Sequence, residues 1–289
     1  MIREVRSKKE LDSEIANNDR IYFRLTGGFG NQLFGLSEAF KLSNALKRHV
    51  LIDVGSIEHS KNSVPEWHEW SRNQNWFSII NIQENISRDF ELVNLGEGDH
   101  YLTTENRFFT GWKFSLRNVE LSGLFQRSNF PFKSGIERPI PIALHYRAGD
   151  YAHAEGIGVL KHDYYSRALA KLESSNKVMV FSDDRDAAIS LITSLGIENR
   201  SEISHQESAI DVLFALATAE SLITSNSTLS WWANYFSNSA KRIAPKPFYL
   251  QDWRFDSAAK FQETEYLSRF ATRRELIFTR SKWFIRSFL

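Results

Sequence analysis

The sequence predicts an α/β protein of two Rossmann-like domains that face a cleft. The chain has 289 residues, 42% of them hydrophobic, which suits two domains with cores of ordinary size. Short apolar runs alternate twice with segments of helical periodicity, a pattern typical of parallel sheets covered by helices. Pro139 and Pro141 separate the two series. We therefore expect an N-terminal domain over residues 1–138 and a C-terminal domain over residues 139–289.

The first series begins with a buried strand at Ile21–Leu25, followed by a glycine-rich turn. Apolar residues then recur at helical spacing between Leu33 and Leu46, and Val50–Val54 is the next expected strand. Strand, helix and strand form a βαβ unit, which favours a parallel sheet. Further short strands are expected around Leu92 and Leu121.

The second series alternates in the same way. We expect strands within 138–146, 177–181, 221–224 and 241–245, and helices over 164–174, 185–196, 208–220 and 227–237. The tail Arg269–Leu289 carries six basic residues against one acid, interleaved with five aromatic residues. It predicts either a terminal helix packed back on the N-terminal domain or one resting on an anionic membrane surface.

Composition excludes several classes of protein. The net charge of +1 provides no general field for nucleic acid, so we expect no nucleic-acid partner. The absence of cysteine excludes disulfides, thiolate metal sites and a thiol nucleophile. The N-terminus has no apolar signal segment, and no stretch is long and apolar enough to span a membrane. These features indicate a cytoplasmic protein.

The glycine-rich turn is a first candidate for ligand contact. Glycines at a strand end let a ligand approach the backbone, and a helix N-terminus favours anions. Gly28 and Gly30 half-fit the dinucleotide fingerprint, with Asp53 at the next strand end, but Leu33 holds the third glycine position. Ligand contact and a plain tight turn both remain open.

The segment "ALHYRAGDYAHAEG" is the second candidate. It follows a strand whose carboxyl end would face the ligand crevice of a parallel sheet. Arg147 is suited to bind a phosphate through two hydrogen bonds, and Asp150 or Glu155 to take a proton from an incoming hydroxyl. The alternative is a surface ion pair between Arg147 and Asp150.

Two further strand ends carry polar residues. Asp183 and Asp184 follow the strand 177–181, and Asp184 with Asp186 has the D-x-D spacing of a metal–nucleotide site. The alternative is helix capping by Ser182 or Asp183. After the strand 221–224, several residues with hydroxyl groups stand at the start of a helix, which predicts either an anion-binding turn or an ordinary N-cap. The residues concerned are Ser227, Thr228 and Ser230, together with the preceding Asn226.

Six segments, in sequence order, resemble the motifs of glycosyltransferase family 11, the α-1,2-fucosyltransferases. They are "RLTGGFGNQLFGLSEAFKLS", "LSGLFQRSNF", "HYRAGDY", "VLKHDYYSRAL", "FSDD" and "DVLFALATAESLITSNSTLSWWANYF". Two positions differ from the family pattern. Ala148 stands where a second arginine is common, and Gln126-Arg127 stands in place of Gln-Ser. Arg147 therefore provides a single guanidinium where two are common in the family.

The resemblance implies a GT-B-like architecture with GDP-fucose bound in the interdomain cleft by the C-terminal domain. It implies an inverting transfer that needs no metal and no cofactor. Arg147 and the Ser227–Ser230 turn would stabilise the leaving group. Asp150, then Glu155, would serve as base. Donor contacts would come from Gly28, Gly30, Asn31, His145, Arg147, Asp183, Asp184, Asn226, Ser227, Thr228 and Ser230.

The acceptor is expected to be a galactose-type residue of a surface glycan assembled on a lipid carrier, and the basic tail would then hold the enzyme at the inner membrane face. Trp67, Trp70 and Trp76 are candidates for stacking on the acceptor, or for core packing. Three other functions stay open: a metal-dependent glycosyltransferase using Asp184 and Asp186, a nucleotide-binding oxidoreductase, and a non-catalytic nucleotide-sugar binder.

Overall fold

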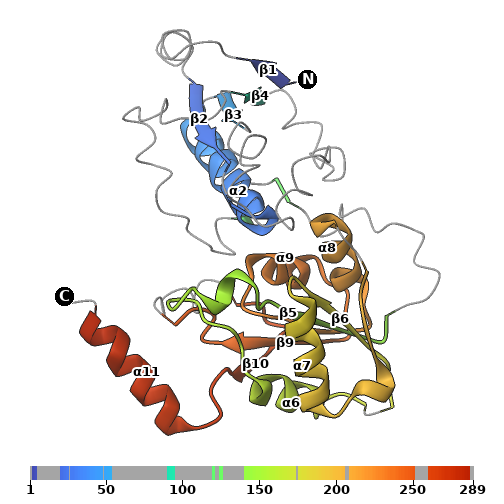
Figure 1. Ribbon diagram of the computed structural model, residues 1–289. Coiled ribbons are helices and arrows are strands. Elements are labelled where there is room, and N and C mark those ends of the chain that lie inside the picture. Colours follow the sequence, from blue (N-terminus) through green and yellow to red (C-terminus); the bar gives the residue numbers. More distant parts are fainter. Residues whose placement is uncertain are drawn as a thin grey trace. The chain divides into compact units, whose positions relative to one another are not determined.

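The computed structural model describes residues 2–4, 20–25, 27–47, 49–53, 90–94, 119–120, 124–125, 140–173, 175–205, 208–250 and 260–286. The chain divides into two compact units. Unit 1 is Met1–Pro131 with Ser208–Ile210, and unit 2 is Phe132–Glu207 with Asp211–Leu289. The division predicted between residues 138 and 139 adjoins residues outside the described ones and stays a prediction. The described residues of each unit form one parallel sheet (Figure 1).

Unit 1 contains a four-stranded sheet in the order β1-β4-β3-β2. Its strands are β1 (Ile2–Glu4), β2 (Arg20–Arg24), β3 (His49–Asp53) and β4 (Phe90–Asn94), and α2 (Phe29–Leu46) connects β2 to β3. The predicted βαβ unit and the strand near Leu92 are confirmed, whereas Leu121 lies outside the described residues. The helix packs closely on β2, because a Cβ atom on Gly35 would lie 2.8 Å from the ring of Phe23.

Unit 2 contains a six-stranded sheet in the order β10-β9-β8-β5-β6-β7. Its strands are β5 (Ile142–Tyr146), β6 (Val178–Ser182), β7 (Ser201–Ile203), β8 (Ser221–Ile223), β9 (Lys241–Lys246) and β10 (Glu265–Ser268). Its helices are η5 (Asp150–Ala152), α6 (His162–Leu169), α7 (Arg185–Leu195), η6 (Glu198–Arg200), α8 (Ala209–Thr218), α9 (Thr228–Phe236) and α11 (Arg273–Arg286).

The predicted class, α/β with two Rossmann-like sheets, is confirmed by these two units. All four strands and all four helices expected in the second series are present. The short strands β1, β7 and β10 were not predicted, since three or four residues are too few to show a period of two.

Two tyrosines of α6 connect the core of unit 2 to the strand ends above it. Tyr164 and Tyr165 are wholly buried, so their hydroxyl groups require partners. The Tyr164 hydroxyl donates to the carbonyl of Thr224 at 2.9 Å, and the Tyr165 hydroxyl donates to the carbonyl of His145 at 3.1 Å. The core therefore fixes the carboxyl ends of β8 and β5 relative to each other.

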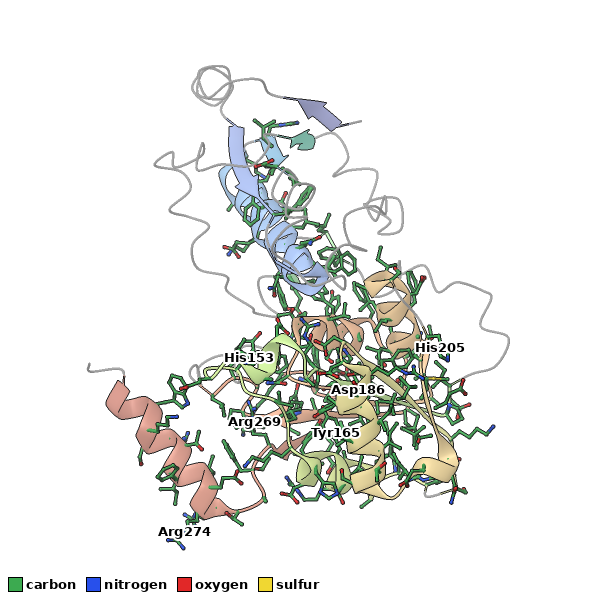
Figure 2. The ribbon with its side chains drawn as sticks, in the orientation of Figure 1. His153, Tyr165, Asp186, His205, Arg269 and Arg274 are labelled. Atoms are coloured by element: carbon green, nitrogen blue, oxygen red, sulfur yellow. The ribbon has the colours of Figure 1, made fainter. Side chains whose placement is uncertain are left out.

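A buried arginine at the end of β10 holds the loop that follows η5. Arg269 is 5% exposed and donates to the carbonyls of Ile157, Phe248 and Gly158 at 2.9, 3.1 and 2.8 Å (Figure 2). Gly158 has φ +66°, a conformation that disfavours other residues. The conformation of this loop is thus stabilised by an arginine that is distant from it in the sequence.

Replacing Arg269 by methionine should lower the free energy of unfolding by about 3 kcal/mol, because three carbonyls lose a charged donor. Urea denaturation followed by tryptophan fluorescence measures the change. The control is Arg274→Met on the exposed surface of α11 (Figure 2), expected to shift stability by less than about 0.5 kcal/mol. Equal effects of the two substitutions would contradict the assignment.

Candidate active site

The predicted polar residues gather where the strand order of the unit 2 sheet reverses. β5 pairs with β6 on one side and with β8 on the other, all in parallel. The chain continues from β5 through β6 to β7 in one direction, and from β8 through β9 to β10 in the other. Open α/β sheets bind ligands outside the carboxyl ends of the strands at such a switch point. Arg147 directly follows β5, and Ser225 lies two residues after β8.

Arg147 lies buried between two carboxylates and an aromatic ring. Its side chain is 6% exposed. Nε lies 3.1 Å from Oδ2 of Asp183, and Nη2 lies 2.9 Å from Oδ1 of Asp150. The guanidinium carbon is 5.3 Å from the centroid of the Tyr151 ring, within the range of a cation–π contact. The ion pair with Asp150, considered above as a surface feature, therefore forms on a buried arginine.

Asp183 connects the end of β6 to the segment that carries Arg147. Its Oδ1 accepts a hydrogen bond from the backbone N–H of Ala148 at 2.9 Å, while Oδ2 meets Arg147. A Cβ atom on Gly149 would lie 2.7 Å from Oδ2, so only glycine allows the carboxylate this close. Asp183 thus fixes three consecutive residues at the tip of β5.

The serine-rich turn after β8 is buried and hydrogen-bonded within itself. Ser227 is the N-cap of α9, and its Oγ accepts from the backbone N–H of Leu229 at 3.2 Å. Ser225 Oγ accepts from the N–H of Ser227 at 3.2 Å, and Ser230 Oγ accepts from the N–H of Ser225 at 3.1 Å. The predicted N-cap is confirmed, and it directs the N-terminus of α9 to the end of β8.

His145, the fourth residue of β5, joins this turn. Its Nδ1 lies 2.5 Å from Ser230 Oγ and 3.2 Å from Ser225 Oγ. Burial, with the nearby charge of Arg147, lowers the pKa of His145 to about 3, so the ring is neutral at physiological pH. If Ser225 Oγ donates to Ser230 Oγ, 3.0 Å away, and Ser230 donates to Nδ1, every hydroxyl proton has an acceptor and the ring proton resides on Nε2. Nε2 is buried and has no hydrogen-bond partner among the described residues.

Tyr151 links Arg147 to the serine-rich turn. It is 8% exposed, its ring lies on the Arg147 guanidinium, and its hydroxyl lies near the side chain of Ser227, which lowers its pKa. Burial raises the pKa of Tyr151 to about 12, so the hydroxyl stays protonated. Arg147 and the turn therefore belong to one contiguous cluster. Sequence reasoning missed Tyr151, although it stands in the same "HYRAGDY" segment.

Asn226 contributes its amide group to the fold. Its Nδ2 donates to the carbonyls of Ile157 and Gly158 at 3.3 and 2.8 Å, the same loop that Arg269 holds. Its Oδ1 is buried without a hydrogen-bond partner among the described residues. The predicted ligand contact can therefore involve the oxygen but not the amide nitrogen. Arg269 and Ser225 were also missed, because their roles depend on partners distant in the sequence.

Three of the predicted acidic residues lie outside this cluster. Glu155 is 66% exposed and pairs with Lys282 of α11 at 3.7 Å. Asp184, not Ser182 or Asp183 as expected, is the N-cap of α7 and accepts from the N–H of Ala187 at 2.9 Å. Asp186 is exposed in the first turn of α7 (Figure 2). Helix capping is therefore confirmed at this position, but the predicted cap residues were wrong.

The remaining candidates lie in unit 1. Gly28 is the N-cap of α2 with φ −67°, so the residue that requires glycine is Gly27, at φ +74°. Gly30 is buried within α2, and the side chain of Asn31 lies against Gly27. Their contact with a donor stays a prediction. Trp67, Trp70 and Trp76 lie outside the described residues.

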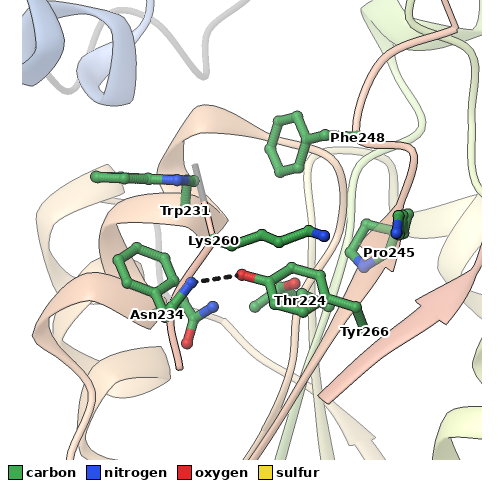
Figure 3. A pocket seen from close by; sticks show the side chains of 10 residues that line it. Thr224, Trp231, Asn234, Pro245, Phe248, Lys260 and Tyr266 are labelled. Atoms are coloured by element: carbon green, nitrogen blue, oxygen red, sulfur yellow. Dashed lines mark hydrogen bonds between the residues drawn. The ribbon is translucent and has the colours of Figure 1, made fainter. Parts of the chain in front are cut away.

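A separate small pocket lies between α9 and the β9–β10 edge (Figure 3). It is lined by Thr224, Trp231, Asn234, Ala244, Pro245, Lys246, Phe248, Lys260, Phe261 and Tyr266. The Tyr266 hydroxyl accepts a hydrogen bond from the N–H of Phe261 at 2.9 Å. None of the residues predicted for the site lines this pocket. In the part of the chain that the structure describes, no group of three His, Cys, Asp or Glu side chains is arranged to hold a metal ion.

Comparisons with known proteins identify the family. The family described as "Glycosyl transferase family 11" matches residues 100–268. The "O-antigen biosynthesis glycosyltransferase WbnK" of Escherichia coli is 34% identical over 115 residues, which cover 36% of this chain and 37% of that protein. The aligned part thus spans little more than a third of the relative's length.

Two groups of solved structures are similar at low identity. The fucosyltransferase NodZ from Bradyrhizobium is 13% identical with a TM-score of 0.41, over 76% of this chain and 93% of that chain. The E. coli heptosyltransferase WaaC with ADP is 11% identical with a TM-score of 0.47, over 93% of this chain and 99% of that chain. Both TM-scores are below the range that establishes a common fold. The match to the family profile confirms the resemblance inferred from the motifs.

The buried His145 should make stability depend on pH. Its pKa is about 3 in the folded protein and 6.5, the ordinary value for histidine, in the unfolded chain, so below pH 6.5 the unfolded chain binds a proton that the folded chain does not. Stability should be constant above that pH and fall by about 2 kcal/mol between about pH 6.5 and pH 5. Chemical denaturation at both pH values measures the drop, which the His145→Gln variant should not show. An identical drop in that variant would contradict the assignment.

Proposed function

Because the chain belongs to glycosyl transferase family 11, we propose that it is an inverting α-1,2-fucosyltransferase. It moves L-fucose from GDP-fucose to the 2-hydroxyl of a galactose-type residue in a surface glycan such as an O-antigen repeat. The observation that carries this proposal is the burial of Arg147 in one cluster with the N-terminus of α9, at the switch point of a parallel sheet. The E. coli relative is named for O-antigen biosynthesis, which supports the class of acceptor.

The leaving group explains why a cation and a helix N-terminus belong together here. A bond forms between the acceptor oxygen and C1 of fucose, while the bond from C1 to the β-phosphate oxygen breaks and its electron pair stays on GDP. Arg147 and the N-terminus of α9, with Ser227, Thr228 and Ser230, offset the charge that develops on the diphosphate. We expect no metal and no cofactor in this step.

The acceptor hydroxyl loses its proton as the new bond forms. Asp150 is our first choice for the base, since its carboxylate is 46% exposed and lies beside Arg147. Glu155 is the second choice for the base, because its carboxylate is paired with Lys282 outside the cluster. Attack from the face opposite the leaving group inverts the configuration at C1.

The nucleobase side involves His145. Its buried Nε2–H is suited to donate to a carbonyl oxygen such as O6 of guanine. Asp183, expected on the same side, accepts a hydrogen bond through Oδ1 and forms an ion pair with Arg147 through Oδ2, which favours a role in holding Arg147. Gly28, Gly30 and Asn31 of unit 1 remain candidates for the approach of donor or acceptor.

Two alternatives remain. A metal-dependent glycosyltransferase for another nucleotide sugar would use Asp184 and Asp186, although Asp184 already caps α7. A non-catalytic binder of nucleotide sugars is the second, and Ala148 in place of a second arginine favours it. Family membership sets aside the oxidoreductase considered for Asp53.

A lipid-linked acceptor would bring the enzyme to the inner face of the cytoplasmic membrane, and α11 is the element we assign to that contact. Ile277 and Phe278 are 54% and 73% exposed on this helix. Arg273, Arg274 and Arg280 are exposed on the same helix, which combines apolar and cationic side chains as interfacial helices do. No described helix has the length and apolarity needed to cross a bilayer.

Thermal unfolding with a panel of sugar nucleotides tests the donor. We expect GDP and GDP-fucose to raise the melting temperature selectively, while UDP, ADP and their sugars leave it unchanged. Transfer of fucose to a galactoside should follow and should persist in EDTA. Arg147→Ala should reduce transfer by at least about a thousandfold with the fold intact. Selective stabilisation by another nucleotide, or loss of activity in EDTA, would contradict the proposal.

Flotation with lipid vesicles tests the role of α11. The protein should bind phosphatidylglycerol vesicles, and the double variant I277S/F278S should bind at least about tenfold more weakly because it loses buried apolar area. Ile189→Ser, at a 47% exposed position on α7, is the matched control and should bind like the parent protein. Unchanged binding by the double variant would instead favour the packing of this helix on the N-terminal domain.

A further inference from the structure

The two carboxylates that contact Arg147 are held very differently. The side chain of Asp183 is 5% exposed; its Oδ1 accepts a hydrogen bond from the Ala148 N–H, and its Oδ2 forms an ion pair with Arg147 Nε at 3.1 Å. Asp150 is 46% exposed and meets Arg147 through a single oxygen, at Nη2. Exposed ion pairs contribute little to stability, whereas breaking a buried pair is costly. An incoming anion can therefore displace Asp150 far more readily than Asp183.

The geometry of the guanidinium identifies where that anion binds. A guanidinium offers two edges to an oxyanion, Nε with Nη2 and Nη1 with Nη2. Asp183 holds Nε, so the edge suited to a second oxyanion is Nη1 with Nη2. Asp150 lies on Nη2, the nitrogen that both edges share. With both carboxylates in place, Arg147 is also overcompensated, and a diphosphate would meet net negative charge.

We propose that Asp150 occupies the position of a phosphate oxygen on Arg147 in the ligand-free protein and leaves when a diphosphate binds, while Asp183 acts as the positioning residue that keeps Arg147 in place. The identity of the anion rests on the proposed function. The exchange replaces one charge-assisted hydrogen bond to Nη2 by another, so Arg147 stays compensated throughout.

The exchange requires only a side-chain rotation. Tyr151, the next residue, is buried with its ring on Arg147, so the backbone at Asp150 can stay in place. A displaced Asp150 carboxylate is then available to accept the proton of an acceptor hydroxyl. Binding of the donor thereby releases the Asp150 carboxylate to act as the base. When the donor is absent, Asp150 is paired with Arg147.

Isothermal titration of the protein with inorganic pyrophosphate and with GDP tests the exchange. Asp150→Asn removes the competing charge and should tighten the binding of both ligands about five- to tenfold. Asp183→Asn should weaken both at least about tenfold, because Arg147 loses its fixed orientation. Asp163→Asn on α6, whose side chain is 52% exposed, removes one charge elsewhere in unit 2 and should leave both affinities unchanged.

Weaker or unchanged binding of pyrophosphate by Asp150→Asn would overturn the proposal, since Asp150 would then position Arg147 or play no part. An equal gain in the Asp163→Asn control, or no pyrophosphate binding by any variant, would also overturn it. If Asp150→Asn tightens pyrophosphate while GDP binds no better than UDP or ADP, the GDP-fucose assignment fails and the exchange at Arg147 stands.

Discussion

The contact between Arg147 and Asp183 is the interaction on which the site depends. A guanidinium that is almost wholly buried is tolerated only with a compensating charge and good hydrogen-bond geometry. Asp183 supplies the compensating charge and also accepts a hydrogen bond from the backbone of Ala148, so one carboxylate joins the end of β6 to the tip of β5. Glycine at position 149 is the steric condition for this contact. Without the contact between Arg147 and Asp183, neither the direction of Arg147 nor the placement of Tyr151 would be fixed.

The second part of the site is neutral and rigid. Ser225, Ser230 and His145 form a buried network in which every hydroxyl proton has an acceptor when the ring proton resides on Nε2. A neutral imidazole next to a guanidinium avoids repulsion that a charged ring would add, and this repulsion lowers the pKa of His145 further than burial does alone. The network orients the start of α9 toward the same strand ends as Arg147. A cation and a helix N-terminus are thus held at one switch point by separate sets of bonds.

Two arginines of unit 2 are equally buried yet suited to different tasks. Arg269 bonds to neutral carbonyls of loops that it holds together, and nothing in that arrangement favours exchange with an anion. Arg147 faces carboxylates, one of which is half exposed. The chemical nature and exposure of the partners, rather than burial, therefore distinguish a structural arginine from one suited to bind phosphate. The loop held by Arg269 and Asn226 follows η5, the short helix that contains Tyr151. Arg269 therefore also helps to fix the segment that contacts Arg147.

The sequence by itself determined the alternation of strands and helices, the positions of Arg147 and the serine-rich turn at strand ends, and the family, because these depend on local periodicity and on residues close together in the chain. It did not determine which acid caps α7, which glycine requires positive φ, or that Tyr151, Ser225 and Arg269 take part. Only the tertiary structure decided these points. It also distinguished Asp183, which is buried and holds Arg147, from Asp150, which is half exposed and can exchange with an anion. The reason is physical: hydrogen-bond partners and exposure arise from segments up to about a hundred residues apart that meet only when the parallel sheet forms.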